Sequence, residues 1–253
     1  QELDDALANI KVCDPAIGSG AFPVGMLTEI IKARKVLELY LDKKITVYEL
    51  KRHCIQNSLY GVDIDPGAIE ISKLRLWLSL VVDEIDYTTI QPLPNLDYKI
   101  MQGNSLIEEF HGISLDIKRK ELQQEDFFAG GSELDEFIDD LHQKQDNFFN
   151  AEHPREKKKN REAVETAIYN IFHNELKKKR NISPQEAKEI ETDLKEMTHG
   201  NRERNFFPWK LYFADVFREK GGFDVIIANP PYIGQKGNNK LFQAIKKTKL
   251  GSN

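Results

Sequence analysis

Residues 10–20 read IKVCDPAIGSG, and this stretch decides the fold class. The apolar run at 10–13 indicates a short strand, and the turn Asp14–Gly20 behind it contains two glycines. Glycine lets a backbone turn tightly and approach a ligand closely. An amphipathic stretch over roughly 20–41 follows and predicts a helix. A strand, a glycine turn and a helix in this order are typical of the first unit of an α/β sheet.

The same alternation continues along the first part of the chain. Residues 46–59 and 66–82 predict two further helices, the second with Pro66 in its first turn. Residues 58–64 and 98–103 predict two further strands. Strands that alternate with helices predict an α/β fold with a doubly wound, mostly parallel sheet.

The pattern changes after the third strand. Residues 106–204 are rich in charged residues, with apolar residues at helical spacing, and we expect a long helical insertion between two strands. The sheet resumes at FDVIIAN, residues 223–229. Two basic runs within the insertion, 156–161 and 176–180, are either solvated helix faces or contacts to a nucleic-acid backbone.

Composition sets limits on the function. The 253 residues carry a net charge of −5, so the chain as a whole is not a basic nucleic-acid binder, although basic residues can cluster locally. Cys13 and Cys54 have no metal-binding spacing, which favours reduced cysteines, no metal site and a cytoplasmic location. No apolar run reaches the length of a membrane span. The last residues, 241–253, resemble a helix cut short, so we expect a fragment of a longer protein.

Three polar groups follow the predicted strands. Asp14 could pair with a cation on a ligand whose carboxylate or phosphate binds the start of the next helix, which suits an amino acid or a derivative of one. Asp63 stands where doubly wound folds hold ribose hydroxyls, whereas Asp65 precedes Pro66 and is expected to cap the helix. Asn104 could bind the exocyclic amine of a purine. A plain strand–helix turn at Asp14, and ordinary Gly-Asn turn chemistry at Asn104, remain the alternatives.

The fourth stretch, residues 222–234, reads GFDVIIANPPYIG. Pro230 and Pro231 remove two backbone donors and fix two φ angles, so the strand ends abruptly behind Asn229. An exocyclic aromatic amine is a poor nucleophile because its lone pair is delocalised into the ring. The Asn229 amide oxygen and the Pro230 carbonyl could accept its two hydrogens from fixed positions, and Tyr232 could stack on the base. The alternative is a proline-rich turn after a strand.

These stretches, in this order, resemble the adenine-N6-specific DNA methyltransferases, and especially the methylase portion of type IIG restriction–modification enzymes. The likeness covers about residues 10–110 and 205–235. It is carried by DPAIGSGAF (14–22), GVDIDPGAIEISKLRLWLSL (61–80), GNSL (103–106), FFPWKLYFADVF (206–217) and the Asn-Pro-Pro-Tyr motif (229–232).

The resemblance implies the S-adenosylmethionine-dependent methyltransferase fold, incomplete at its C-terminus, and S-adenosylmethionine as the cofactor. Asp63 would hold the ribose, Ile64 would flank the adenine ring, and Phe22 would pack beneath the glycine turn. The implied cofactor residues are Asp14, Pro15, Ala16, Gly18, Gly20, Phe22, Asp63, Ile64 and Asn104. The implied catalytic residues are Asn229, Pro230, Pro231 and Tyr232.

The resemblance also implies an organisation and partners. Residues 1–105 would be the cofactor-binding half, 106–204 a charged helical insertion, and 205–253 the truncated catalytic segment. The substrate would be double-stranded DNA with a flipped-out adenine, in the bacterial cytoplasm. A C-terminal target-recognition domain and an N-terminal nuclease domain would belong to the same polypeptide, and the fragment could be inactive without them.

Three other functions compete with this one. Asn-Pro-Pro-Tyr also serves the methylation of RNA bases and of protein glutamine. A cofactor-binding domain could instead regulate an attached nuclease. A nicotinamide dehydrogenase is disfavoured, because Pro23 stands where the third glycine of G-x-G-x-x-G is required.

Overall fold

The computed structural model describes residues 1–41, 44–82, 96–113, 133–151, 153–178, 182–198 and 202–230, together with Gln243 and Lys246. Contacts divide the chain into two compact units. The first comprises residues 1–105 and 222–242, and the second comprises 106–221 and 243–253. Residues 205–221 therefore belong to the second unit. The functional parts expected from the sequence, with boundaries at 105 and 204, stay a prediction.

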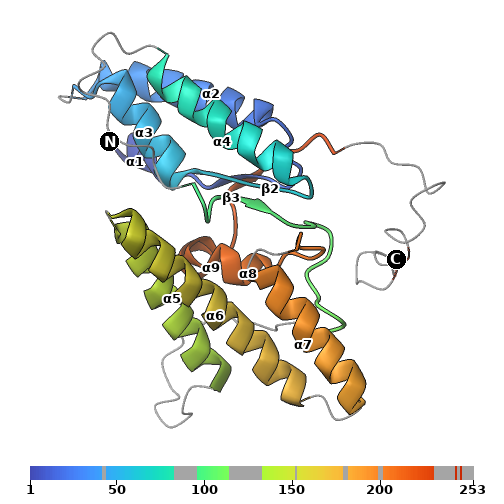
Figure 1. The fold of residues 1–253 in the computed structure, drawn as a ribbon. Helices are drawn as coiled ribbons and strands as arrows, with labels where there is room; N and C mark the ends of the chain where they lie inside the picture. Colours follow the sequence, from blue (N-terminus) through green and yellow to red (C-terminus); the bar gives the residue numbers. More distant parts are fainter. Residues whose placement is uncertain are drawn as a thin grey trace. The chain divides into compact units, whose positions relative to one another are not determined.

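A parallel sheet forms the centre of the first unit (Figure 1). Its strands lie in the order β3-β2-β1-β4, and every neighbouring pair is parallel. The α/β class with a mostly parallel sheet is thereby confirmed. The strands are β1 (Val12–Asp14), β2 (Leu59–Asp63), β3 (Ile100–Gln102) and β4 (Val225–Ile226).

Two helices of the first unit, α3 and α4, begin where the sequence carries start signals. Thr46 and Glu49 form a reciprocal capping box at the start of α3. Asp65 caps α4 by accepting a hydrogen bond of 2.8 Å from the Gly67 N–H, and Pro66 opens the helix, as predicted. The helices are α1 (Glu2–Ala8), α2 (Ala21–Glu38), α3 (Val47–Asn57) and α4 (Pro66–Val81).

The core of this unit lies between the sheet and the helices α2, α3 and α4, which Figure 1 shows together on one side of the strands. Burial of apolar side chains there provides the main driving force for folding. The most buried members include Val12, Leu27, Ile55, Leu59, Leu76, Leu80 and Ile100. Cys13 and Cys54 are free and buried, and burial raises the pKa of the Cys54 thiol to about 11.

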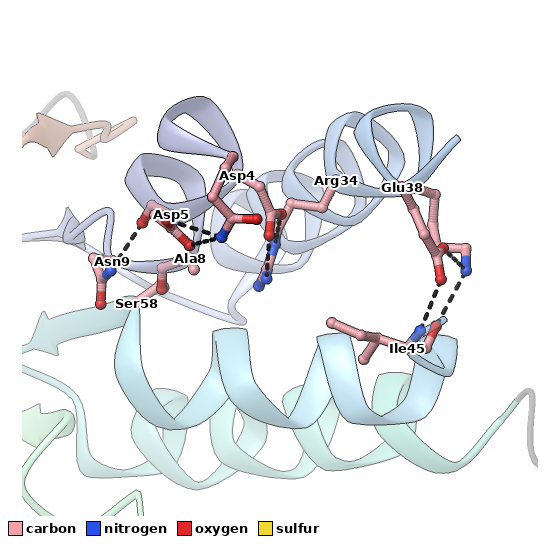
Figure 2. Close-up of polar contacts among 10 residues, drawn as sticks. Asp4, Asp5, Ala8, Asn9, Arg34, Glu38, Ile45 and Ser58 are labelled. Carbon is pink, nitrogen blue, oxygen red and sulfur yellow. Dashed lines mark hydrogen bonds and ion pairs between the residues drawn. The ribbon is translucent and has the colours of Figure 1, made fainter. Parts of the chain in front are cut away.

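Helix α1 has no counterpart among the sequence predictions. It is attached to α2 by a buried ion pair in which Arg34 Nε donates to Asp4 Oδ1 at 2.8 Å (Figure 2). Both side chains are less than 10% exposed. Further along α2, Glu38 Oε1 accepts from the Ile45 N–H at 2.7 Å and so ties the end of α2 to the approach to α3 (Figure 2).

Helices make up the regular structure of the second unit over the residues that the structure describes, together with one antiparallel bridge between Phe110 and Ile113. Ser183 caps α7, because its Oγ accepts from the Glu186 N–H at 3.2 Å. The core is strongly aromatic, and its buried rings include Phe110, Phe172, Phe206, Phe207 and Phe213. The helices are α5 (Glu133–Asn150), α6 (Pro154–Lys178), α7 (Pro184–Thr198), α8 (Trp209–Tyr212) and α9 (Ala214–Lys220).

Among the described residues, no helix combines the length and apolar character needed to cross a membrane. The same part of the chain contains no group of three or more His, Cys, Asp or Glu side chains that could hold a metal ion.

Candidate functional site

The carboxyl ends of the strands bring the predicted site residues to one edge of the sheet. β1 ends at Asp14, β2 ends at Asp63 and β3 ends at Gln102. Because the strands are parallel and hydrogen-bonded in register, these ends share an edge. Asn104 and Asn229 follow directly behind β3 and β4. Open parallel sheets bind their ligands at this edge.

The glycine turn behind β1 has the backbone geometry that only glycine adopts readily. Gly18 and Gly20 have φ angles of 51° and 78°, in the left-handed region. The Gly20 N–H donates to the Ile17 carbonyl at 2.8 Å, and the Ile17 N–H donates to the Val62 carbonyl at 3.0 Å. The turn is thus attached to the neighbouring strand β2.

Ile17, within the glycine turn, packs against the neighbouring strand β2. It is 3% exposed and lies against Gly61, where an added Cβ would stand only 2.3 Å from Ile17 Cδ1. A glycine is therefore required at position 61 for the turn to pack against β2. The sequence analysis did not identify this pair, although a glycine inside a strand pattern is a known sign of close approach.

Phe22, which was expected to pack beneath the turn, lies in the first turn of α2. Its side chain is 40% exposed, whereas Pro23 and Leu27 are buried. Residues four apart lie on the same helix face, so Pro23 and Leu27 both belong to the inward face of α2. The place of Phe22 in the cofactor site stays a prediction.

Asp14 is the most unusual group at this edge. The residue is 1% exposed. Its Oδ1 accepts from the Ala16 N–H at 3.0 Å, but its buried Oδ2 has no hydrogen-bond partner among the described residues. Burial raises the pKa of Asp14 from 3.8 to about 6; the Ala16 N–H lowers it, and the Asp63 carboxylate raises it further. A buried carboxylate oxygen without a donor is costly, and a cationic ligand group would relieve that cost.

Asp63 holds two loops together. Its Oδ2 accepts from the Gly18 N–H at 2.8 Å, and its Oδ1 accepts from the Asp65 N–H at 3.0 Å. Each carboxylate oxygen can accept more than one hydrogen bond, so Asp63 retains capacity for ligand hydroxyls. Ile64 beside it is 54% exposed and presents an apolar surface, while Asn104 is only 7% exposed.

Asn229 and Pro230 are exposed behind β4. The Ile227 N–H still donates to the Cys13 carbonyl at 3.0 Å, so β4 follows β1 up to a point two residues before Asn229. The glycine turn and Asn229 therefore follow adjacent parallel strands, β1 and β4. Pro231 and Tyr232 lie outside the described residues.

Pro15 and Ala16 are half-buried within the turn. Every predicted cofactor residue thus belongs to the loops at the carboxyl edge or to the segment that follows one of them. This arrangement could hold an amino-acid-like ligand with a nucleoside part and present it to a second substrate beside β4.

Comparison with known proteins identifies the family. A model of the Eco57I restriction-modification methylase family matches residues 57–253. A protein of Methanocaldococcus jannaschii, named as a putative type II restriction enzyme and methyltransferase, is 29% identical over 278 aligned positions. The alignment covers 90% of this chain and 22% of that relative, so the chain spans about a fifth of the relative's length. The predicted relation to restriction–modification methylases is confirmed: the chain belongs to the Eco57I restriction-modification methylase family.

Proposed function

We propose that this chain is the methyltransferase domain of a restriction–modification enzyme, and that it methylates the exocyclic N6 of adenine in double-stranded DNA. The family membership supports methyl transfer to DNA. The observation that carries the proposal is Asp14, whose buried Oδ2 has no partner among the described residues and would be stabilised by a cation. It stands on the strand adjacent to the one that leads to Asn229.

The residues at the carboxyl edge fit S-adenosylmethionine. The unpartnered oxygen of Asp14 suits the ammonium group of its methionine part. The left-handed turn at Gly18 and Gly20 and the start of α2 suit the carboxylate of the same part. Asp63 suits the ribose hydroxyls and Ile64 suits one face of the adenine ring. When bound, this cofactor supplies an electrophilic methyl group on a sulfonium centre.

The target base would be held beside β4. The Asn229 amide oxygen and the Pro230 carbonyl would accept the two hydrogens of the adenine amine and draw its nitrogen toward tetrahedral geometry. Both acceptors are neutral, so they add no anion that could compete with the target amine for the sulfonium centre. The base must leave the duplex to reach them, and Tyr232 is predicted to stack on it.

Labelled S-adenosylmethionine incubated with the intact protein and with DNA, RNA or protein tests the substrate class. We expect label on adenine N6 in double-stranded DNA. Label found in RNA or in protein alone would refute the DNA assignment and favour one of the other acceptors.

Two variants separate the cofactor site from the target site. Asn229→Ala should lower the methylation rate by about 100-fold or more, because it removes a positioned acceptor, and should leave cofactor binding unchanged. Asp14→Asn should weaken cofactor binding instead. Undiminished DNA methylation by Asn229→Ala would contradict the catalytic assignment.

The name of the Methanocaldococcus jannaschii relative includes a restriction enzyme, which favours a second candidate function. In this case the domain binds cofactor to regulate a nuclease in the same polypeptide. Cofactor-dependent DNA cleavage without any methyl transfer in the unaltered protein would identify this function. We also propose a target-recognition domain as a further partner within that polypeptide.

A further inference from the structure

Three consecutive residues of the glycine turn are held by three separate contacts. The Gly18 N–H donates to Asp63 at the end of β2. The next two residues, Ser19 and Gly20, are held by a different element, the helix α4.

Arg75 makes the first of the α4 contacts. Its Nη1 donates to Ser19 Oγ at 3.1 Å, across 56 positions of sequence. This hydrogen bond lies at the exposed surface of the unit. It is charge-assisted, and it restricts Ser19, the middle one of these three residues.

The second contact is close packing between Ser72 and Gly20, which depends on the small size of both residues. An added Cβ on Gly20 would lie 3.0 Å from Ser72 Cβ and 3.2 Å from Ser72 Cα. Ser72 is fully buried, and its hydroxyl donates to the Ile69 carbonyl of its own helix at 2.9 Å. The hydroxyl is therefore satisfied within α4, and the turn packs against the body of the residue.

Ser72 and Arg75 are three residues apart and so lie on one face of α4. The helix itself is fixed in the core by Leu76 and Leu80, which are at most 1% exposed. The position of α4 therefore determines how Ser19 and Gly20 are held. A ligand site that is already ordered before binding binds more tightly, because no free energy is lost in ordering it.

We propose that Ser72 and Arg75 are positioning residues that keep the glycine turn in its ligand-binding conformation and thereby determine the affinity for S-adenosylmethionine. This inference rests on the proposed function, because it concerns the same turn. Neither residue is assigned a contact with the cofactor. When the Arg75 hydrogen bond is lost, the turn occupies the competent conformation for a smaller fraction of the time, and the apparent affinity falls by that fraction.

The test is equilibrium binding of S-adenosylmethionine and of S-adenosylhomocysteine to the intact protein by calorimetry. Arg75→Ala should weaken binding by about two- to tenfold, the usual worth of one hydrogen bond, and Arg75→Lys should recover part of the loss. The KM for the cofactor should rise by the same factor, while kcat at saturating cofactor changes by less than about twofold. Lys32→Ala, which removes an exposed cation of α2 paired with Glu29, is the matched control and should bind normally.

A second pair of variants tests the packing. Ser72→Leu should weaken binding more than Ser72→Ala, because a larger side chain would occupy the space of Gly20. If Ser72→Leu does not fold, the variants of Arg75, which is exposed, still test the positioning role. The wild-type protein and Arg75→Ala could bind the cofactor equally tightly and with the same KM. That result would refute the positioning role of α4 and would leave the proposed function standing. Absence of binding by the wild-type protein would refute the proposed function, and this inference with it.

Discussion

Replacing Asp14 by Asn should change how the stability of the first unit depends on pH. The pKa of Asp14 is raised from 3.8 to about 6, chiefly by burial. Because the pKa is higher in the folded state, the unfolded chain loses this proton first as the pH rises. Below pH 3.8 Asp14 is neutral in both states and does not lower the free energy of unfolding. That free energy falls as the pH rises from 3.8 through about 6.

The magnitude follows from the two pKa values. Each pH unit between 3.8 and about 6 is worth about 1.4 kcal/mol, so the ionised Asp14 destabilises the folded unit by up to about 3 kcal/mol at pH 8. At pH 5 the same relation gives about 1.6 kcal/mol. The amide that the Asp14→Asn variant introduces has its own cost in the buried site, but that cost does not vary with pH. The variant's stability relative to wild type should therefore be about 1.4 kcal/mol higher at pH 8 than at pH 5.

Urea unfolding followed by tryptophan fluorescence measures this difference. The chain has two tryptophans, Trp77 in α4 of the first unit and Trp209 at the start of α8 in the second. In a Trp209→Phe background, Trp77 reports on the first unit alone. Asp65→Asn, which keeps a residue able to cap α4 and removes one carboxylate nearby, controls for net charge. A stability difference between Asp14→Asn and wild type that is the same at pH 5 and pH 8 would refute the reasoning.

Three further predictions concern packing, the α1 attachment and the basic run of the second unit. Gly61→Ala should lower the free energy of unfolding by about 1–3 kcal/mol, because its Cβ would overlap Ile17; unfolding in urea with no loss would contradict this. Asp4→Asn should cost about 3–5 kcal/mol by leaving Arg34 buried without its ion partner, and calorimetric melting measures the loss. Reversing the charges of Lys157–Lys159, in the first turns of α6, should weaken DNA binding by the intact protein and flatten its salt dependence; an unchanged slope would assign these lysines to solvation alone.

Local patterns were sufficient to identify the elements of the first unit that surround the glycine turn. The strand at 10–13, the turn itself and the Pro66 helix start all depend on neighbouring residues, and each was predicted close to its observed bounds. The Asp65 cap depends on a contact across two residues and was also predicted. Such features are encoded locally, because backbone geometry and hydrogen bonding within a turn involve few positions.

Contacts between distant residues could not be predicted in this way. The ion pair that attaches α1 joins Asp4 to Arg34, and a single sequence shows no periodicity that links them. The contact between Ile17 of the turn and Gly61 of β2 was not predicted either, because it forms only when the fold places the turn against the neighbouring strand.

The order of residues alone determined that this chain alternates strands with helices, and it indicated which polar groups stand at strand ends. Only the tertiary structure decided that β4 lies beside β1: the Lys11 N–H donates to Asp224 Oδ2 across 213 positions of sequence, with the helical insertion between them. The physical reason is that strand pairing depends on which edge of the sheet is free and on how the faces are buried, and neither is a property of any local stretch. That pairing brings Asp14 and Asn229 to the same edge of the sheet.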